Sequence, residues 1–354
     1  MDIARQRLHN LRLSGQKVEA SADAVRWLLA VQSQDFAPAL WSVGLRLQAT
    51  AEADLLRDFD AGAFLRTHVL RPTWHFVAPE DIRWLLALTA PRVHGVNGTI
   101  YRQQDLSAAL LGRCQTLFAR ALQGGRHLTR DELGDALARA GVADPTRQRL
   151  AYMVMAAELD GVICSGPRAG KQFTYALLEE RVAPAPNRSR DDALAELARR
   201  YFAGRGPASV QDFARWSSLT LSDAQAGLEA ARNGLIAVSS DGQELWAQPT
   251  ETRLEPAPPA LLLSVFDEYV AGYRDRGAIC PPRYWKVLEG LGNALHHILV
   301  IDGQIVGTWR RTLTKTVVKI ELAPLRRLSA GEKRAVKAEA ARFGVFLGLP
   351  VEIE

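Results

Sequence analysis

Apolar positions along the chain fall into helical spacings and short β-type runs, and the order of these elements repeats. In the clearest copy, a helix is predicted over 107–124 and a second follows the capping box that opens on Thr129. A third is predicted to start at Asp144-Pro145 and to end at Gly161, and the segment 162–178 then predicts a β-hairpin. Three helices and a β-hairpin are the plan of a winged-helix unit.

The same plan is predicted twice more. Over 191–248, a third helix opens at Ser222, and a hairpin follows with strands Leu235–Val238 and Glu244–Ala247. A looser copy occupies the first hundred residues, with helices near 2–14, 21–31, 37–47 and 51–61 and a hairpin formed by Phe64–Val69 and Thr73–Ala78. The copies share the order of their elements and not their residues, which indicates a repeated architecture.

The last hundred residues follow a different pattern. Two β-type runs flank Asp302-Gly303, which is a strong signal for a two-residue hairpin turn. The predicted elements are the strands His297–Ile301, Gln304–Trp309 and Thr316–Leu322, a helix over 330–344 and a closing strand at Val351–Ile353. We therefore predict an α+β protein in which tandem winged-helix units are followed by a small β-barrel-like domain with one helix.

Two proline-rich stretches, 182–187 and 255–259, mark boundaries between compact units, because proline continues neither a helix nor a central strand. With the end of the first copy, they divide the chain into four predicted parts. These are three winged-helix units at 1–106, 107–186 and 187–255, and the C-terminal β-rich domain at 256–354.

The composition is that of a globular protein with a mild positive charge. Hydrophobic residues make up 47% and charged residues 23%, and the formal net charge is +5. No apolar run is long enough to cross a membrane and no signal-peptide pattern is present, so we expect a cytoplasmic, nucleoid-associated protein. The three cysteines are scattered, which argues against a zinc site or a disulfide framework. The positive charge is compatible with a polyanion as partner.

Basic residues in the middle unit are candidate DNA contacts. The N-terminal end of the third helix enters the groove in helix-turn-helix proteins, and here it carries Arg147 and Arg149. The hairpin turn carries Arg168 and Lys171, as a minor-groove probe would. The alternatives are a solvated helix start and an ordinary basic turn, since winged helices also serve as protein-interaction modules.

A second basic set lies in the C-terminal domain, where Arg310, Arg311, Lys315 and Lys319 are candidates for a phosphate track. If both lysines lie on one strand, they share a face of it. A solvated sheet edge is the alternative interpretation.

The most unusual local feature is Gln32-Ser33-Gln34-Asp35, which precedes Pro38. Proline disfavours a helix just before it, and in an extended segment residues two apart point the same way. Gln32 and Gln34 would then present two amides to one target, and Asp35 could act as a base because amides do not titrate. The alternative is a polar helix end before a turn.

Two further pairs are possible accessory residues. Trp74 and His75 lie in the first hairpin, where a packed structural histidine is the alternative to a functional one. Asp267 and Glu268 suggest acid–base chemistry or magnesium binding, but Arg274 and Arg276 follow closely, which favours a structural ion-pair network.

Short motifs spread in order over nearly the whole chain belong together. They are Gln32–Asp35, Leu40-Trp41, Arg66-Thr67, Arg71–Val77, Tyr201-Phe202, Gly206–Ala208, Asp212–Trp216, Phe266–Tyr269, Gly272–Arg276 and Gly307–Trp309. In these motifs the chain resembles the bacterial winged-helix family that contains the AlkZ-like DNA glycosylases.

The resemblance implies tandem winged helices and a β-barrel-like domain around a concave DNA cleft. It also implies that a Gln-x-Gln motif at the base of the cleft is catalytic, which here is Gln32 and Gln34. The middle position is usually aliphatic in the family, whereas this chain has Ser33.

The residues suit the chemistry that the resemblance implies. An N7- or N3-alkylated purine is already a good leaving group, so an enzyme needs to orient water at C1′ and to stabilise an oxocarbenium-like state. We therefore expect a monofunctional DNA glycosylase for alkylated or crosslinked purines. It would act as a monomer on damaged double-stranded DNA, away from membranes and with neither metal nor cofactor. The alternatives are a non-catalytic winged-helix regulator or architectural protein, and an unrelated hydrolase that uses Asp267 or His75.

Overall fold

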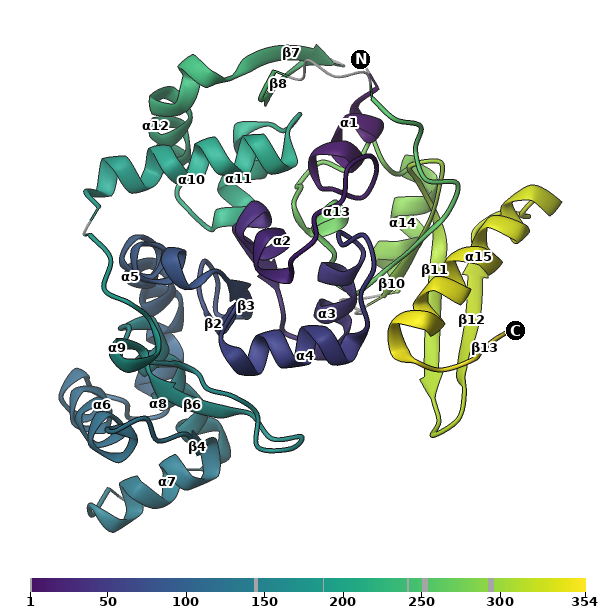
Figure 1. Ribbon diagram of the computed structural model, residues 1–354. Coiled ribbons are helices and arrows are strands. Elements are labelled where there is room, and N and C mark those ends of the chain that lie inside the picture. The colour runs from purple at the N-terminus through teal and green to yellow at the C-terminus, as the bar shows by residue number, and fades with distance from the viewer. Residues whose placement is uncertain (1, 143–145, 187, 241, 250–253, 292–295) are drawn as a thin grey trace.

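The computed structural model describes residues 2–142, 146–186, 188–240, 242–249, 254–291 and 296–354 of the chain. Within them, helices and strands alternate in a mixed α+β fold, as the sequence predicts. No helix in these ranges combines the length and the apolar character needed to cross a membrane. Figure 1 shows the arrangement of the elements.

The first part of the chain builds a three-stranded sheet surrounded by helices, with the strand order β1-β3-β2. Its elements are α1 (Ile3–Asn10), α2 (Ser21–Leu28), β1 (Ala30–Gln32), α3 (Phe36–Gly44), α4 (Glu52–Ala61), β2 (Leu65–His68) and β3 (Trp74–Val77). The helix predicted over 21–31 is too long, because Leu29 takes a positive φ of 65° and Ala30–Gln32 then pairs with β3. This short strand places the Gln32–Asp35 segment against the β2–β3 hairpin.

A long helix that the sequence analysis omits, α5 (Pro79–Gln103), leads into the second part. The elements that follow are α6 (Ala108–Leu122), β4 (Leu128–Thr129), α7 (Arg130–Arg139), α8 (Arg147–Leu159), β5 (Ile163–Ser165), β6 (Thr174–Leu177) and α9 (Leu178–Arg181). The predicted capping box at Thr129 is present. The predicted helix start at Asp144-Pro145 lies outside the described residues, and α8 is capped by Thr146. This part has a core of its own, built around Phe118, Leu133 and Met153.

The third part packs α10 (Arg190–Arg205) against α12 (Leu221–Ala231), with α11 (Val210–Ser217) between them in the chain and the hairpin β7 (Ile236–Ser240) and β8 (Gln243–Ala247) after them. A 3-10 turn, Arg232–Gly234, separates α12 from β7. The predicted opening of α12 at Ser222 is wrong by two residues, because the Thr220 hydroxyl accepts the backbone N–H of Asp223 over 3.0 Å.

The C-terminal part is a five-stranded sheet of order β13-β12-β11-β10-β9. Its elements are β9 (Leu261–Leu263), α13 (Glu268–Ala271), α14 (Pro282–Gly290), β10 (His297–Ile301), β11 (Gln304–Leu313), β12 (Val318–Pro324), α15 (Ala330–Leu347) and β13 (Val351–Ile353). The predicted Asp302-Gly303 turn is confirmed, and both residues have positive φ.

The barrel-like expectation is corrected for the described residues, because β9 and β13 are the two open edges of this sheet. The chain returns through α15, so β13 joins β12 in parallel and does not close the sheet onto β9. The expectation of one helix is also wrong, since α13 and α14 lie between β9 and β10.

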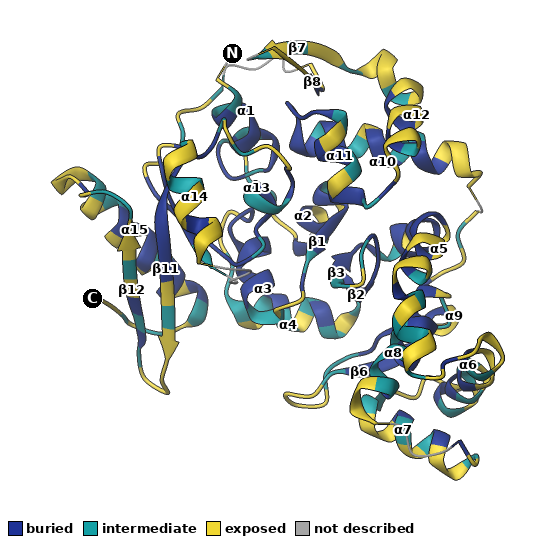
Figure 2. Ribbon diagram, turned by 180° about the vertical axis from the view of Figure 1, so that it is seen from behind, coloured by how far each residue is buried: buried dark blue, intermediate teal, exposed yellow. Residues whose placement is uncertain are grey.

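One hydrophobic core joins the first, third and C-terminal parts of the chain. Trp41 of α3 packs its ring against Phe343 and Phe346 of α15, with ring centroids 5.0 Å apart in each case. Figure 2 shows that α2, α3 and β11 turn buried residues toward this centre, whereas much of α6, α7 and α12 is exposed. The hairpin β11–β12 and the loop before β6 both extend beyond α4 in the same direction (Figure 1).

Candidate active site

The Gln32–Asp35 segment links β1 to α3 and is not helical, as the sequence predicts. Gln32 pairs with His75 across the β1–β3 ladder, and the backbone N–H of Ser33 donates to the carbonyl of Trp74 over 2.8 Å. Asp35 is exposed and begins α3 without capping it through its side chain. The backbone of the segment is therefore held by the β2–β3 hairpin, Ser33 is buried, and the side chains of Gln32, Gln34 and Asp35 remain at least partly exposed.

The amide of Gln32 is held in one orientation by Arg71. The Arg71 guanidinium donates to Gln32 Oε1 over 3.0 Å, to the carbonyl of Trp216 over 2.6 Å and to His75 Nε2 at 3.2 Å. A guanidinium has no acceptor, so the oxygen and not the nitrogen of the Gln32 amide faces it. The NH₂ group of Gln32 points elsewhere, and it makes no hydrogen bond to a described residue.

Gln34 is oriented in the same sense. Its Oε1 accepts the backbone N–H of Trp74 over 3.2 Å, which again leaves the NH₂ group as the free end. Beneath it, Arg66 donates to the carbonyl of Ser33 over 3.0 and 3.1 Å and lies over the Trp74 ring at 4.4 Å. Burial lowers the pKa of Arg66 to about 10, so it remains charged at neutral pH. The two glutamines thus expose two hydrogen-bond donors.

His75 is buried, and both of its ring nitrogens have hydrogen-bond partners. Its Nδ1 bonds to the carbonyl of Thr73 at 2.9 Å, so Nδ1 carries the proton and Nε2 accepts from Arg71. Burial and the neighbouring charge of Arg71 hold the pKa of His75 well below its ordinary value, which keeps the ring neutral. This geometry is that of a packed structural histidine, which is the alternative to a functional one.

Trp74, beside it, stacks on the ring of His68 with centroids 4.3 Å apart. His68 in turn lies 2.5 Å from the Glu158 carboxylate of α8, a buried contact between the first and second parts that the sequence analysis missed.

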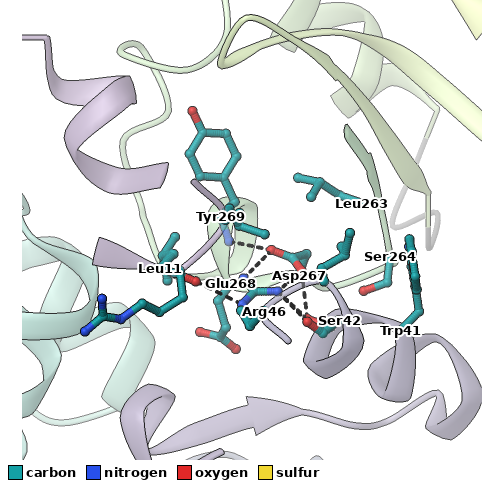
Figure 3. A network of polar contacts seen from close by, with 12 residues as sticks. Leu11, Trp41, Ser42, Arg46, Leu263, Ser264, Asp267, Glu268 and Tyr269 are labelled. Atoms are coloured by element: carbon teal, nitrogen blue, oxygen red, sulfur yellow. Dashed lines mark hydrogen bonds and ion pairs between the residues drawn. The ribbon is translucent and has the colours of Figure 1, made fainter. Parts of the chain in front are cut away.

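Asp267 and Glu268 are buried in separate ion pairs. Asp267 receives two hydrogen bonds from Arg46, at 2.6 and 2.9 Å, and one from the Ser42 hydroxyl at 2.7 Å, as Figure 3 shows. Although burial opposes ionisation, the charge and hydrogen bonds of Arg46 hold the pKa of Asp267 below its ordinary value. The structural ion-pair network that the sequence predicts is present here, but its cations are not Arg274 and Arg276.

Glu268 pairs instead with Arg205 of α10, over 2.7 and 3.0 Å, and also accepts Trp216 Nε1–H over 2.9 Å. Its second oxygen lies 3.4 Å from the backbone nitrogen of Gln32. Through these contacts Glu268 connects the Gln32 strand to the third part of the chain, and it is not free for acid–base work.

No cluster that could hold a metal ion occurs in the described part of the chain.

The basic residues proposed from the middle unit differ in how free they are. Arg147 and Lys171 are exposed, and neither is paired with a described residue. Arg149 donates to the carbonyl of Gln104 over 3.1 Å. Arg168 forms an ion pair with Asp60 of α4, at 2.7 and 3.0 Å, which fastens the loop before β6 to the first part of the chain.

The basic residues of the C-terminal part also differ in their exposure and in their contacts. Arg310 is exposed on β11, and Lys315 lies in the turn after it and not on a strand, so the expectation that Lys315 and Lys319 share a strand face is wrong. Burial lowers the pKa of Arg311, whose guanidinium lies over the Phe343 ring at 5.5 Å. Lys319 approaches Glu352 and Glu354, at 3.8 and 3.5 Å.

An open cavity of about 890 Å³ adjoins Gln32. Four arginines line it together with Gln32, namely Arg71, Arg215, Arg274 and Arg276. These arginines are not among the site residues that the sequence predicts, although all four lie in the motifs that carry the family resemblance.

Comparisons with known proteins identify the family and the fold. A family model described as "DNA glycosylase AlkZ-like" matches residues 25–346. A curated protein from Streptomyces sahachiroi, "Interstrand DNA cross-link repair glycosylase", is 24% identical over 370 residues, which cover 94% of this chain and 93% of that protein. The solved structure of Streptomyces sahachiroi DNA glycosylase AlkZ has the same fold, with a TM-score of 0.83 at 23% identity over 100% of this chain and 98% of that one.

Proposed function

The chain belongs to the AlkZ-like DNA glycosylase family, and from that premise we propose that it hydrolyses the N-glycosidic bond of N7- or N3-alkylated or crosslinked purines in double-stranded DNA. The observation that carries the proposal is the alignment of Gln32 and Gln34. Both amide oxygens are held by donors within the protein, which leaves both NH₂ groups free, and the exposed Asp35 follows Gln34 directly in the chain.

These three groups can divide the work of hydrolysis. The NH₂ group of one glutamine donates to the oxygen of a water molecule, and that of the other donates to the nucleotide beside it, so that both are fixed in position. The Asp35 carboxylate accepts one proton of the water, and the second lone pair of the water oxygen is left free for C1′. The water oxygen forms a bond to C1′, and the electron pair of the glycosidic bond leaves with the purine and neutralises its positive charge. The Asp35 carboxylate also stabilises the positive charge that develops on the sugar ring.

DNA binding by the winged-helix units is the second element of the proposal. The first three parts, with the predicted boundaries 1–106, 107–186 and 187–255, would bind DNA as tandem winged helices in a monomer. Among the basic candidates, Arg147, Lys171, Arg310 and Lys315 are exposed and unpaired in the described part of the chain, so we assign phosphate contacts to these four. Arg168 and Lys319 are already neutralised by carboxylates and contribute less.

The direct test is the release of free base from duplex DNA that contains N7-methylguanine. We expect release by the wild type and a loss of at least about 100-fold in Gln34→Ala, the size of effect seen when one transition-state donor is removed. Gln123→Ala, at an exposed glutamine that follows α6, is the matched control and should keep the wild-type rate. Equal rates in Gln34→Ala and the control would refute the assignment of the site. Binding to DNA without release on a panel of alkylated purines would favour a non-catalytic DNA-binding protein.

A further inference from the structure

Resting on the proposed function, we infer that the cavity beside Gln32 is an anion site that seats backbone phosphate of the DNA strand carrying the lesion. The four arginines that line it come from three separate segments. Arg71 lies in the turn between β2 and β3, Arg215 in α11, and Arg274 and Arg276 in the segment after α13. The fold thus gathers onto one cavity charges that lie far apart in the sequence.

The four arginines of this cavity lack direct ion-pair partners among the described residues. Glu289 is the one acidic residue of the lining, and its carboxylate accepts the indole N–H of Trp285 over 2.5 Å. Burial lowers the pKa of Arg71 and of Arg276, and the charge of nearby Arg215 lowers both further. Glu268 acts in the opposite direction on the pKa of Arg71, as Asp212 and Glu289 do on that of Arg276, so Arg215 repels two guanidinium groups that carboxylates offset only in part. An anion bound among them would relieve this repulsion.

The cavity also has the polar geometry of a built site. Arg71 and Arg276 are fixed by backbone carbonyls, of Trp216 and Val270 respectively, and Arg276 also stacks on the Trp285 ring at 4.4 Å. Arg215 and Arg274 are exposed, and their guanidinium groups have no partner among the described residues. In addition, Nε2 of His296 is buried against the cavity and has no hydrogen-bond partner in the described ranges of the chain. One cavity is therefore lined by two guanidinium groups that backbone carbonyls hold, by two unpaired guanidinium groups and by the Nε2 atom of His296.

The occupant follows from what lies at the edge of the cavity. Gln32 is part of the lining, so a nucleotide whose C1′ faces the two amides brings its own flanking phosphates to the arginines. Arginine binds phosphate oxygens with paired N–H donors, and contacts of this kind set the register of a protein on DNA. Seating these phosphates would hold the rotated backbone of an extruded nucleotide.

The test uses a duplex with a tetrahydrofuran abasic site, in which single phosphates around the site are replaced one at a time by neutral methylphosphonate. We expect the affinity of the wild type to fall about 10-fold where a seated phosphate is neutralised, the value of a charged hydrogen bond. The double variant Arg215→Ala/Arg274→Ala should bind the unmodified duplex more weakly, should be insensitive to methylphosphonate at that same position, and should lose about two from the slope of log affinity against log salt. Arg334→Ala, an exposed arginine on α15, is the control for loss of charge alone.

The inference is overturned if the loss of affinity from the double substitution and the loss from methylphosphonate simply add at every position. The arginines would then act only through general charge. The variant should keep the wild-type unfolding temperature, since both side chains are exposed. Base release is measured separately on the N7-methylguanine duplex. Position-specific coupling without base release leaves the anion site standing and the proposed reaction refuted, and release without coupling does the reverse.

Discussion

Arg71 donates a hydrogen bond to the side-chain oxygen of Gln32 over 3.0 Å, and this contact decides which end of the amide faces the cavity. The amide of Gln32 in β1 is thus oriented by Arg71 of the β2–β3 turn. Arg71 is in turn held by the carbonyl of Trp216 of α11 and by the neutral ring of His75 of β3. In this arrangement Arg71 is a positioning residue for Gln32.

We predict that Arg71→Met lowers single-turnover base release about 10- to 100-fold, as loss of a supporting group typically does, because the Gln32 amide is then free to rotate. Arg71→Lys should not restore the rate, since an ammonium cannot reproduce the planar set of donors. The measurement is the rate at saturating enzyme, with the unfolding temperature as a check on the fold. A variant that binds DNA more weakly but releases base at the wild-type rate when saturated would contradict the positioning role.

Asp35→Asn tests the carboxylate. It keeps the size of the side chain but removes the proton acceptor, so the single-turnover rate should fall by roughly 100-fold or more. The affinity for DNA should stay equal or rise, because a negative charge next to a polyanion is removed. Both quantities are obtained from rate against enzyme concentration. Loss of affinity with an unchanged limiting rate would exclude Asp35 from the chemistry.

Ser33 lies between the two glutamines, and its hydroxyl is buried with no hydrogen-bond partner among the residues that the structure describes. We predict that Ser33→Ala raises the free energy of unfolding by about 1 kcal/mol, because an unsatisfied buried hydroxyl is removed. Base release should not change, since the side chain points away from the exposed amides. Urea denaturation checks the first statement, and a drop in stability would show that the hydroxyl has a partner in solution.

The Arg46–Asp267 pair is a structural requirement of the fold. Asp267→Asn leaves the Arg46 charge buried and uncompensated, so we expect a loss of about 3–5 kcal/mol in the free energy of unfolding. Glu229→Gln is the matched control, because its partner Arg232 is exposed and the change should stay within about 1 kcal/mol. A loss in Asp267→Asn as small as in the control would show that the pair adds nothing to stability.

The same pair gives a pH dependence with a defined sign. The pKa of Asp267 is lower in the folded protein than its ordinary value of 3.8, so the folded state favours the ionised form. This contribution to stability is fully present above about pH 4 and is lost as the pH falls through the lowered value. The wild type should therefore lose stability more steeply than Asp267→Asn when unfolding is followed from neutral to acid pH. Parallel curves for the two proteins would contradict the shift.

Local signals in the sequence predicted local structure well. The Asp302-Gly303 turn and the Thr129 capping box are where the sequence places them, because each depends on residues within a few positions of one another. Strand β1 escaped prediction, because three apolar and polar residues after a helix look like its last turn. Only pairing with β3, more than forty residues later, makes them a strand.

The same distinction between local signals and long-range contacts applies to the candidate site. Gln32, Gln34 and Asp35 could be chosen from a contiguous motif. The residues that hold them could not. Arg71 reaches Gln32 only through the pairing of β1 with the β2–β3 hairpin, and Trp216 and Glu268 come from the third and C-terminal parts, which must first pack against the first part. The partners of Asp267 and Glu268 were missed for the same reason, since Arg46 and Arg205 lie more than sixty residues away from them.

The most direct test of the account is the rate at which Gln34→Glu releases N7-methylguanine from duplex DNA under single-turnover conditions. The substitution keeps the size of the side chain and the oxygen that accepts the Trp74 N–H, and it replaces the outward NH₂ donor by a negatively charged oxygen that can only accept. If the amides act as donors, the rate should fall at least about 100-fold, as in Gln34→Ala. Release at the wild-type rate would contradict the account, because a carboxylate would then do what the donor is proposed to do.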